Sequence, residues 1–383
     1  MKNEVMIVAA EASSSHFAQR LLEYWKAQAV QVHAFGVGSH TMEELGFERL
    51  GKSEEMAVVG AAEIVEHWDK LKSVFNHLVE EATKRRPKVV IVMDYPEFNL
   101  YLARKLHKIG LKVVYYISPQ VWAWRKGRVH TIKKYCDNIF LLFPFEIPFY
   151  ASKGVTHEFV GHPLLDEINP KYYDPKYRSM CRKKYGFQDT DMVIGLMPGS
   201  RRIELRQHMK IQLQVAEKLS LAHKNLKFYI LVAPTFTKDQ VRDQIPADIY
   251  VNYVLVKDDP FEMIQLSDII LAASGTATLQ VGLLHKPMVI MYKFKWLTGI
   301  FAKIMVRGIR FFGLVNLILD EEVVPERWQS GANVDELAKL MNRYLVDPSY
   351  RQLTIDKLKQ IESKLGSKGA TERVAKALEK YFA

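Results

Sequence analysis

The chain has 383 residues, of which 48% are hydrophobic and 25% charged, and a formal net charge of +11. This composition is that of a folded globular protein, so it excludes wholesale disorder and low-complexity architectures. Cys136 and Cys181 lie in no Cys/His cluster, which excludes a disulfide scaffold and a zinc ribbon and indicates a reducing compartment. The first apolar run, residues 5–10, is too short for a signal peptide, and no window has the roughly 18 apolar residues of a membrane-spanning helix.

Short β-branched runs alternate with longer amphipathic stretches, a pattern typical of a parallel sheet covered by helices. The expected strands are residues 5–10, 32–37, 89–93, 113–117 and 139–143 in the first half, and 192–197, 228–232, 253–256, 269–272 and 288–291 in the second. Residues 64–78 have apolar side chains at helical spacing. From residue 333 onward the sequence predicts charged helices, the last of them amphipathic and near residues 372–382.

The two series predict an α/β protein with two facing, Rossmann-like doubly wound domains. We expect an N-terminal, acceptor-side domain at 1–165, a C-terminal, UDP-sugar-binding domain at 166–345, and helices at 346–383 that pack back on the first domain. Residues 161–187 contain His-Pro, Asn-Pro and Asp-Pro pairs and are expected to form the hinge. Ligands of such sheets bind beyond the carboxyl ends of the strands, so the loops there and the cleft between the domains are the expected site.

Two loops of the first half have side chains suited to chemistry. The loop after residues 5–10 contains Glu11 and small hydroxyl residues such as Ser13, which could bind an anion at a helix start or simply cap that helix. It has no glycine, which disfavours a dinucleotide fingerprint. Asp94 follows residues 89–93, where a desolvated carboxylate can act as a general base, although Asp94 could instead cap the next helix.

A third loop, residues 118–128, combines tryptophans with cations. Trp122 and Trp124 lie beside Arg125, Lys126 and Arg128. Such a set suits the face of a sugar, or an acyl chain, next to a phosphate. The alternative is a loop packed by its own tryptophans, with a solvated basic end.

Two small-residue loops of the second half indicate a nucleotide-diphosphate pocket. In the first, residues 197–204, Gly199 allows close approach of the backbone, the new helix offers N–H groups, and Arg201 offers a planar fork for phosphate oxygens. In the second, residues 272–280, small residues allow a helix start to approach another phosphate, and Gln280 could reach a ribose hydroxyl. Asp189 and Asp191 imitate a metal-binding pair, but they precede a strand in a polar turn and are interpreted as solvated.

At these motifs the sequence resembles the lipid-A-disaccharide synthases, a family of inverting glycosyltransferases with the GT-B architecture. The matching positions are residues 11–13, 36–46, 56–60, 94–99, 118–128, 143–146, 161–163, 198–204 and 274–276, with Asn316, Pro325, Glu326 and Gln329. The Ser-Pro-x-Val-Trp-Ala-Trp and Pro-Gly-Ser-Arg-x-x-Glu stretches are distinctive.

The resemblance implies a role in lipid A and lipopolysaccharide biosynthesis. The donor is expected to be UDP-2,3-diacylglucosamine and the acceptor 2,3-diacylglucosamine 1-phosphate, joined by a β-1,6 bond with release of UDP and with no cofactor, metal or nucleic acid. Asp94 matches the general base. The implied substrate-binding positions are Glu11, Ser13, Asn99, Trp124, Arg125, Ser200, Arg201, Glu204, Ser274, Gly275, Thr276, Gln280 and Asn316.

Some positions depart from the family pattern. Ser14 and Ser15 replace a glycine and a carboxylate, Gln280 replaces a glutamate, Val315 replaces a proline and Ser39 replaces a glycine. These departures keep two alternatives open. One is a diverged GT-B enzyme, with another acceptor or with UDP-sugar epimerase activity. The other is a sugar-nucleotide-binding paralogue with weakened catalysis.

Residues 291–319 contain no acidic residue. Lys303, Arg307 and Arg310 lie among large aromatic residues, which predicts an interfacial segment attracted to anionic lipid. The expected location is therefore cytoplasmic, with peripheral attachment to the inner membrane. The alternative is a core helix with a solvated basic face.

Overall fold

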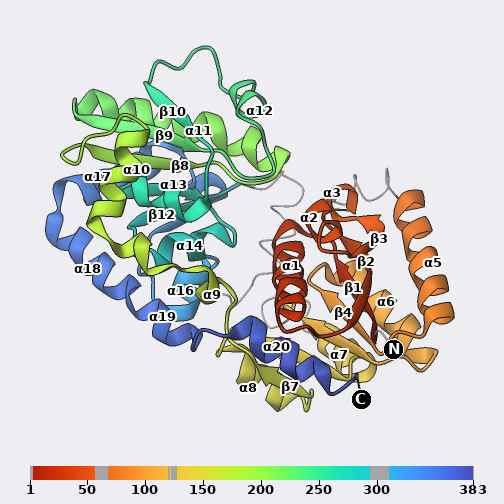
Figure 1. Ribbon diagram of the computed structural model, residues 1–383. Coiled ribbons are helices and arrows are strands. Elements are labelled where there is room, and N and C mark those ends of the chain that lie inside the picture. The colour runs from red at the N-terminus through yellow and green to blue at the C-terminus, as the bar shows by residue number, and fades with distance from the viewer. Residues whose placement is uncertain (1–2, 57–67, 120, 122–126, 294–309, 383) are drawn as a thin grey trace. The chain divides into compact units, whose positions relative to one another are not determined.

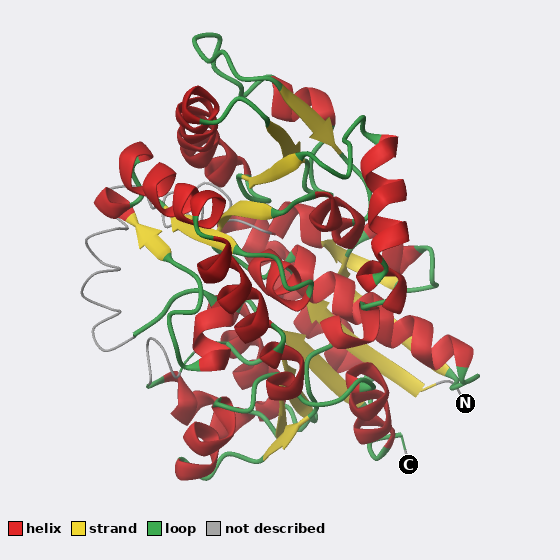
Figure 2. Ribbon diagram, turned by 90° about the vertical axis from the view of Figure 1, so that its left-hand side faces the viewer, coloured by secondary structure: helices red, strands yellow, loops and turns green. Residues whose placement is uncertain are grey.

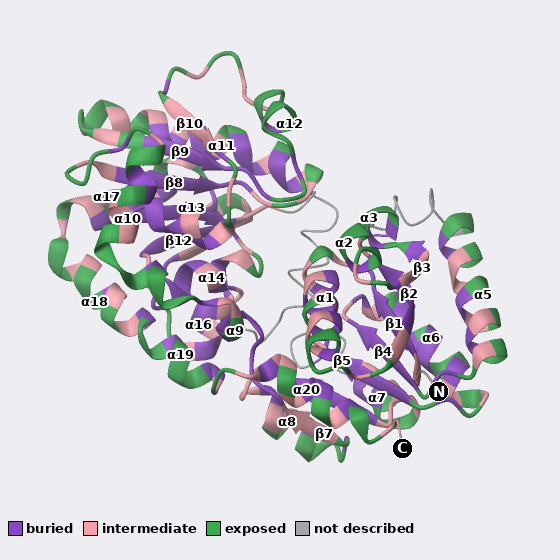
Figure 3. Ribbon diagram, viewed as in Figure 1, coloured by how far each residue is buried: buried purple, intermediate pink, exposed green. Residues whose placement is uncertain are grey.

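The computed structural model describes residues 3–56, 68–119, 121, 127–293 and 310–382. The chain divides into two compact units, the first formed by Met1–Asp166 with Leu365–Ala383 and the second by Glu167–Lys364. Each unit contains one sheet with helices on both of its faces (Figure 1, Figure 2). The inner strands of both sheets are largely buried (Figure 3), and every neighbouring pair is parallel.

The sheet of the first unit has the strand order β3-β2-β1-β4-β5-β6-β7. Its strands are β1 (Asn3–Ala9), β2 (Val32–Gly38), β3 (Glu48–Lys52), β4 (Val89–Met93), β5 (Val113–Tyr116), β6 (Asn138–Leu141) and β7 (His157–Phe159). The central strand β4 is Val-Val-Ile-Val-Met and is buried throughout. A parallel strand covered on both faces needs such a continuous apolar run, which is why the sequence predicts it well.

Two groups of helices cover this sheet. The helices are α1 (Ala12–Ala27), α2 (His40–Glu43), α3 (Ser53–Met56), α5 (Trp68–Arg85), α6 (Pro96–Lys108), α7 (Arg128–Tyr135), α8 (Glu146–Ser152), α9 (Leu164–Glu167) and α20 (Ala370–Glu379). Apolar residues of α5, α6 and α7 form one core with β1, β2, β4 and β5. Helix α1 contacts α20, and its Phe17, Leu21 and Trp25 are buried outside that core.

The end of the chain is tied to the first unit by polar contacts. The carboxylate of Asp166 accepts the backbone N–H groups of Gly369 (2.5 Å) and Thr371 (3.1 Å). Arg373 Nε donates to the carbonyl oxygen of Val160 (2.8 Å). These bonds join the segment around α20 to α9 and to the residue that follows β7.

His162 lies between Val160 and Asp166 in the chain and is 2% exposed. Its ring packs against Phe17 (5.9 Å between centroids) and Phe143 (5.2 Å), and its Nδ1 accepts the backbone N–H of Leu164 (3.2 Å). Burial lowers the pKa of His162 from 6.5 to about 3. The folded protein therefore holds a neutral imidazole that takes up a proton on unfolding, so its contribution to stability is complete above pH 6.5 and is lost as the pH falls toward 3.

His162→Asn is expected to reduce the pH dependence of stability, because it keeps an acceptor for Leu164 without the titrating ring. Between about pH 7 and pH 5 the wild-type chain should lose about 2 kcal/mol of unfolding free energy more than the variant. Urea unfolding at the two pH values measures this difference. His130→Asn, at an exposed histidine, is the control. Equal pH dependence in wild type and His162→Asn would contradict the assignment.

The sheet of the second unit has the order β10-β9-β8-β11-β12-β13. Its strands are β8 (Met192–Met197), β9 (Leu226–Leu231), β10 (Tyr253–Val256), β11 (Ile269–Ala273), β12 (Met288–Tyr292) and β13 (Glu326–Trp328). The helices are α10 (Pro175–Lys184), α11 (Arg202–Ala222), α12 (Lys238–Arg242), α13 (Pro260–Leu266), α14 (Ala277–Leu283), α16 (Leu314–Leu319), α17 (Val334–Val346), α18 (Pro348–Leu358) and α19 (Gln360–Leu365), with short 3-10 turns at Pro170–Tyr173 and Gln329–Gly331. Helices α11 and α17 share one apolar core with the sheet.

All ten expected strands are present, with ends shifted by at most two residues. The sequence did not predict β3, β7 and β13, which are all edge strands. The segment expected as a hinge, residues 161–187, is mostly helical, and its α10 packs against α13 of the second unit. Of the helical stretch expected at 64–78, residues before Trp68 lie outside the described residues. The predicted C-terminal helices are confirmed as α17 to α20.

Candidate active site

Strand order reverses once in each sheet, and the predicted loops lie at these two points. In the first unit the reversal falls between β1 and β4, where Ala9 is level with Met93. In the second it falls between β8 and β11, where Met197 is level with Ala272. Parallel sheets bind ligands at the carboxyl ends of the strands at such a switch point. Each unit therefore brings two of the predicted loops side by side.

The loop after β1 is closed by its own serines. Glu11 is the N-cap of α1, and its carboxylate accepts the backbone N–H of Ser14. Ser14 Oγ in turn accepts the Glu11 N–H (3.1 Å), and Ser15 Oγ donates to the carbonyl of Ala9 (2.9 Å). The helix is thus capped by Glu11 rather than by Ser13 or Ser14; Ser14 completes the capping box, and Ser13 is half-buried on the first turn of α1. The two departures from the family motif are structural side chains here.

The loop after β4 presents Asp94 on a left-handed turn. Asp94 and Tyr95 have φ angles of 50° and 41°, and α6 starts immediately after them at Pro96. Tyr95, not Asp94, is the N-cap of this helix, so the interpretation of Asp94 as a helix cap is wrong. Asn99 is fully buried, and its Nδ2 donates to the carbonyls of Met93 (3.0 Å) and Asp94 (2.7 Å). Asn99 thus contacts the backbone of the turn.

Two carboxylates lie near Tyr95, the residue that follows Asp94. Burial, the charge of Glu11 and the charge of Glu97 together raise the pKa of Tyr95, which shows that the loops after β1 and β4 share one electrostatic environment. Glu97 forms an ion pair with Arg128, at the start of α7. Arg128, the last residue of the basic loop 118–128, therefore contacts the first turn of α6, which follows the Asp94 turn directly. Trp124 and Arg125 lie outside the described residues.

The loop after β8 is filled by a carboxylate of its own helix. Glu204 is 7% exposed, and its Oε2 accepts the backbone N–H groups of Ser200 (3.0 Å) and Arg201 (3.3 Å). Gly199 has a φ of 124°, and a Cβ there would lie 2.5 Å from Glu204 Oε2. The N–H groups of Ser200 and Arg201 are therefore bonded within the protein. The Arg201 guanidinium lies 3.6 Å from Glu204 Oε1, with its side chain 39% exposed.

Two further residues of α11 support this loop and were missed from the sequence. His208 is fully buried; its Nδ1 donates to the carbonyl of Pro198 (2.8 Å), and its Nε2 accepts the backbone N–H of Lys293 (3.1 Å). Burial lowers the pKa of His208, which keeps the ring neutral, as this bonding pattern requires. Gln212 donates to the carbonyl of Met197 (3.1 Å). The spacing of Glu204, His208 and Gln212, four residues apart, places them on one helix face and was the available signal.

The loop after β11 has the more open backbone. Ser274 N donates to the carbonyl of Met291 (3.0 Å), and Thr278 Oγ1 donates to the carbonyl of Gly275 (2.7 Å). In the part of the chain that the structure describes, the N–H groups of Gly275 and Thr276 have no protein acceptor. The turn is exposed, and Gln280 is half-buried one helical turn beyond it. Of the two predicted phosphate loops, this one offers backbone donors.

Asn316 lies in α16 and is fully buried. Its Nδ2 donates to the carbonyl of Val324 (2.8 Å) and to Glu326 Oε1 (2.7 Å), and its Oδ1 accepts the N–H groups of Val323 (2.8 Å) and Val324 (3.0 Å). An amide side chain has two donors and two acceptor positions, so all of these are occupied within the protein. In this conformation Asn316 holds the chain before β13.

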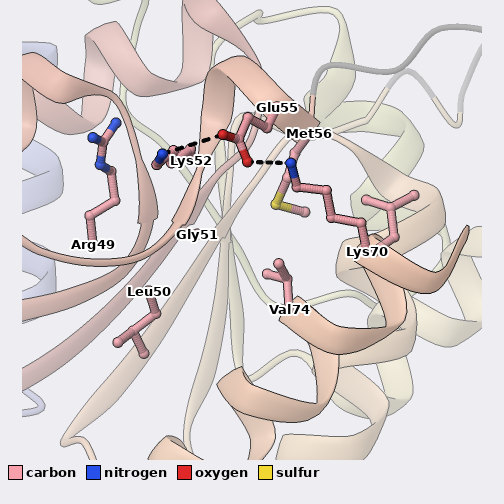
Figure 4. A pocket seen from close by; sticks show the side chains of 9 residues that line it. Arg49, Leu50, Gly51, Lys52, Glu55, Met56, Lys70 and Val74 are labelled. Atoms are coloured by element: carbon pink, nitrogen blue, oxygen red, sulfur yellow. Dashed lines mark ion pairs between the residues drawn. The ribbon is translucent and has the colours of Figure 1, made fainter. Parts of the chain in front are cut away.

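A pocket of the first unit lies apart from these loops, between β3 and α5 (Figure 4). Its polar lining includes Glu55, which lies 2.6 Å from Lys70 Nζ and 3.4 Å from Lys52 Nζ. These two ammonium groups lower the pKa of Glu55. The one carboxylate of this lining is thus paired with two of its three cations, and none of the predicted site residues lines the pocket.

Two general features of the described residues bear on ligands. They contain no group of three or more His, Cys, Asp or Glu side chains placed to hold a metal ion. No described helix combines the length and the apolar composition that crossing a bilayer requires.

Asp189 and Asp191 precede β8, at the end of the sheet opposite to the predicted loops, and accept hydrogen bonds from Ser179 and Gln188.

Two Rossmann-like units, each with polar loops at its switch point, define a protein of the GT-B class. The family model for lipid-A-disaccharide synthetase matches residues 5–380. The lipid-A-disaccharide synthase of Geobacter sulfurreducens is 37% identical over 373 residues, which cover 97% of this chain and 96% of that protein. The enzyme of Myxococcus xanthus is 31% identical over 374 residues, which cover 98% and 96%. This chain therefore belongs to the lipid-A-disaccharide synthase family and is a hexosyltransferase of lipid A biosynthesis.

Solved structures share the fold at low sequence identity. Staphylococcus aureus MnaA with UDP superposes with a TM-score of 0.67 at 13% identity, covering 100% of this chain and 97% of that one. The UDP-GlcNAc 2-epimerase of Neisseria meningitidis bound to UDP-GlcNAc gives 0.65 at 14%, covering 99% and 100%. Acinetobacter baumannii MurG gives 0.58 at 15%, covering 99% of each chain. These similarities establish the GT-B architecture.

Proposed function

We propose that this chain joins UDP-2,3-diacylglucosamine to 2,3-diacylglucosamine 1-phosphate through a β-1,6 bond, with inversion and release of UDP. Membership of the lipid-A-disaccharide synthase family supports this pair of substrates. The observation that carries the proposal is the Asp94 turn, which sets a carboxylate at the switch point of the first sheet, beside the loop of Glu11. That position suits a group that acts on the acceptor.

The proposed reaction is one displacement assisted by one base. The acceptor hydroxyl oxygen forms a bond to the anomeric carbon of the donor, and the bond from that carbon to the β-phosphate oxygen breaks. The carboxylate of Asp94 accepts the hydroxyl proton. Arg201 stabilises the negative charge that grows on the leaving diphosphate, and the N–H groups of Gly275 and Thr276 donate hydrogen bonds to it. In this proposal the leaving group is stabilised by Arg201 and by two backbone N–H groups, and no metal takes part.

The remaining predicted residues receive supporting roles. We propose that Ser274 and Gln280 contact the nucleotide, that Ser200 and Glu204 hold Arg201 in place, and that Asn99 fixes the Asp94 turn. Glu11 and Ser13 border the acceptor. Trp124 and Arg125 are proposed to contact the acylated sugar and its phosphate. Asn316 is proposed to support the second unit through its hydrogen bonds to the backbone before β13.

One assay tests the proposal. Purified protein is incubated with the acylated UDP-glucosamine and the lipid acceptor, with and without a chelator, and the products are identified by mass spectrometry. The expected result is disaccharide 1-phosphate and UDP in equal amounts at a rate that the chelator leaves unchanged. Turnover that requires another acceptor or epimerises the donor supports a diverged GT-B enzyme. Tight UDP binding without any product supports a weakened paralogue.

We also propose that the enzyme works at the cytoplasmic surface of the inner membrane, since both proposed substrates have acyl chains that water scarcely dissolves. Lys303 and Arg307 lie outside the described residues. Arg310 is exposed, and its guanidinium lies 4.9 Å from the centroid of the buried Phe311 ring. Changing these three cations to Gln should weaken binding to anionic vesicles at low salt, where charge attraction is least screened. If the wild-type protein does not bind such vesicles at low salt, attachment by this segment is contradicted.

A further inference from the structure

The backbone around Asp94 is in an unusual conformation. Asp94 and Tyr95 both have positive φ angles, and so does Ile117 (64°), which follows the neighbouring strand β5. Asp94 N approaches the carbonyl of Ile117 at 3.4 Å, so the two turns are joined. Non-glycine residues in this region of φ are strained, and they persist only where surrounding contacts hold them. The contacts that hold Asp94 are therefore informative.

Two side chains converge on one atom of this turn. The carbonyl oxygen of Asp94 accepts the hydroxyl of Tyr115 (2.6 Å) and Nδ2 of Asn99 (2.7 Å). Both side chains belong to residues that are fully buried, and they come from different elements, β5 and α6. A carbonyl oxygen has two lone pairs, so this acceptor is saturated. The Asp94 peptide is thus fixed from the sheet and from the helix at once.

We propose that Tyr115 is a positioning residue, which aims the Asp94 carboxylate at the acceptor hydroxyl by holding the Asp94 carbonyl. This inference rests on the proposed function of Asp94 as general base. Tyr115 is suited to the task because its ring is packed in the apolar core between sheet and helices, which fixes the place of its hydroxyl. The hydroxyl also remains a donor, because burial and the negative charge of Asp94 raise the pKa of Tyr115 well above its usual value.

The neighbouring Tyr116 provides a matched control. It is 1% exposed, and successive residues of a strand point to opposite faces, so its side chain lies on the other side of the sheet. Its ring meets Phe140 edge-on, with 6.3 Å between the centroids. Tyr116→Phe therefore removes a buried hydroxyl from the same strand without changing a bond to the Asp94 carbonyl.

Tyr115→Phe is expected to lower kcat by about tenfold or more with little change in the KM for the UDP donor, since a small misplacement of a reacting group has effects of this size. Tyr116→Phe should keep kcat near the wild-type value. Thermal unfolding of both variants is measured in parallel. A similar loss of kcat in the two variants, or a loss that follows their unfolding temperatures, overturns the positioning role.

A double-variant cycle separates this inference from the proposed function. If Tyr115 acts through Asp94, adding Tyr115→Phe to Asp94→Asn should change the residual turnover by less than about twofold. A full additional loss in the double variant shows that Tyr115 acts elsewhere and overturns the inference. Wild-type turnover of Asp94→Asn alone refutes the general base instead. An impaired Asp94→Asn with an unimpaired Tyr115→Phe refutes only the positioning role.

Discussion

Asp94→Asn is expected to lower turnover by about 100-fold or more, the usual range for removal of a general base. The amide has nearly the shape of the carboxylate, and the Asp94 turn is held through its backbone, so the fold should persist. UDP affinity should be unchanged, because the proposed nucleotide contacts belong to the second unit. Steady-state kinetics at saturating donor and acceptor measure turnover, and calorimetry measures UDP binding.

Asp189→Asn is the control for this change. It alters an exposed aspartate that precedes β8 and that imitates half of a metal-binding pair. Its turnover should remain near that of the wild type. Near-normal turnover of Asp94→Asn would show that Asp94 is a structural residue, whereas a large loss in Asp189→Asn would revive the interpretation of that pair as functional.

Arg201→Ala is expected to weaken UDP binding by about 10-fold to 100-fold and to slow the reaction, because charge-assisted hydrogen bonds to the leaving diphosphate are lost. The loop itself should survive the change, since Glu204 holds it through the backbone N–H groups of Ser200 and residue 201. Calorimetric titration with UDP and the rate of product formation are the two measurements.

Arg202→Ala removes the same charge from the next, exposed position and is the matched control. It should leave UDP affinity within a factor of about two, because an exposed charge at this distance is screened. Equal losses of UDP affinity in both variants would show that Arg201 acts only through the general attraction of a positive charge for UDP. Unchanged UDP affinity in Arg201→Ala would move the diphosphate site to the loop of Gly275.

The central strands could be predicted because burial on both faces demands unbroken apolar runs, as in β4 and β11. The edge strands could not. β3 reads Glu-Arg-Leu-Gly-Lys and is largely unburied, while β7 and β13 have only three residues each, all of them half-buried. Short, polar segments of this kind become strands because a neighbouring strand offers hydrogen bonds, which no local pattern records.

The positions of the candidate loops could be predicted from the sequence, but the contacts that their side chains make could not. Loops that follow buried strands can be located from the sequence, and Asp94, Arg201 and Gly275 lie in such loops. The bond from Tyr115 to the Asp94 carbonyl spans two strands and has no periodic signature. Glu204 was predicted as a substrate contact, yet its carboxylate caps its own helix. A side chain that binds backbone and one that binds ligand look alike in a sequence.

The hydrogen bonds that Asp166 and Arg373 form near the end of the chain have a consequence for how the protein folds during translation. The first unit is discontinuous: Met1–Asp166 is completed only by Leu365–Ala383, after the whole of the second unit has been translated. During synthesis the face of α1 that meets α20 therefore stays uncovered while Glu167–Lys364 emerges and folds. Exposed apolar surface of this kind is what chaperones bind on nascent chains. Helix α20 can therefore complete the first unit only after the second unit has been synthesised.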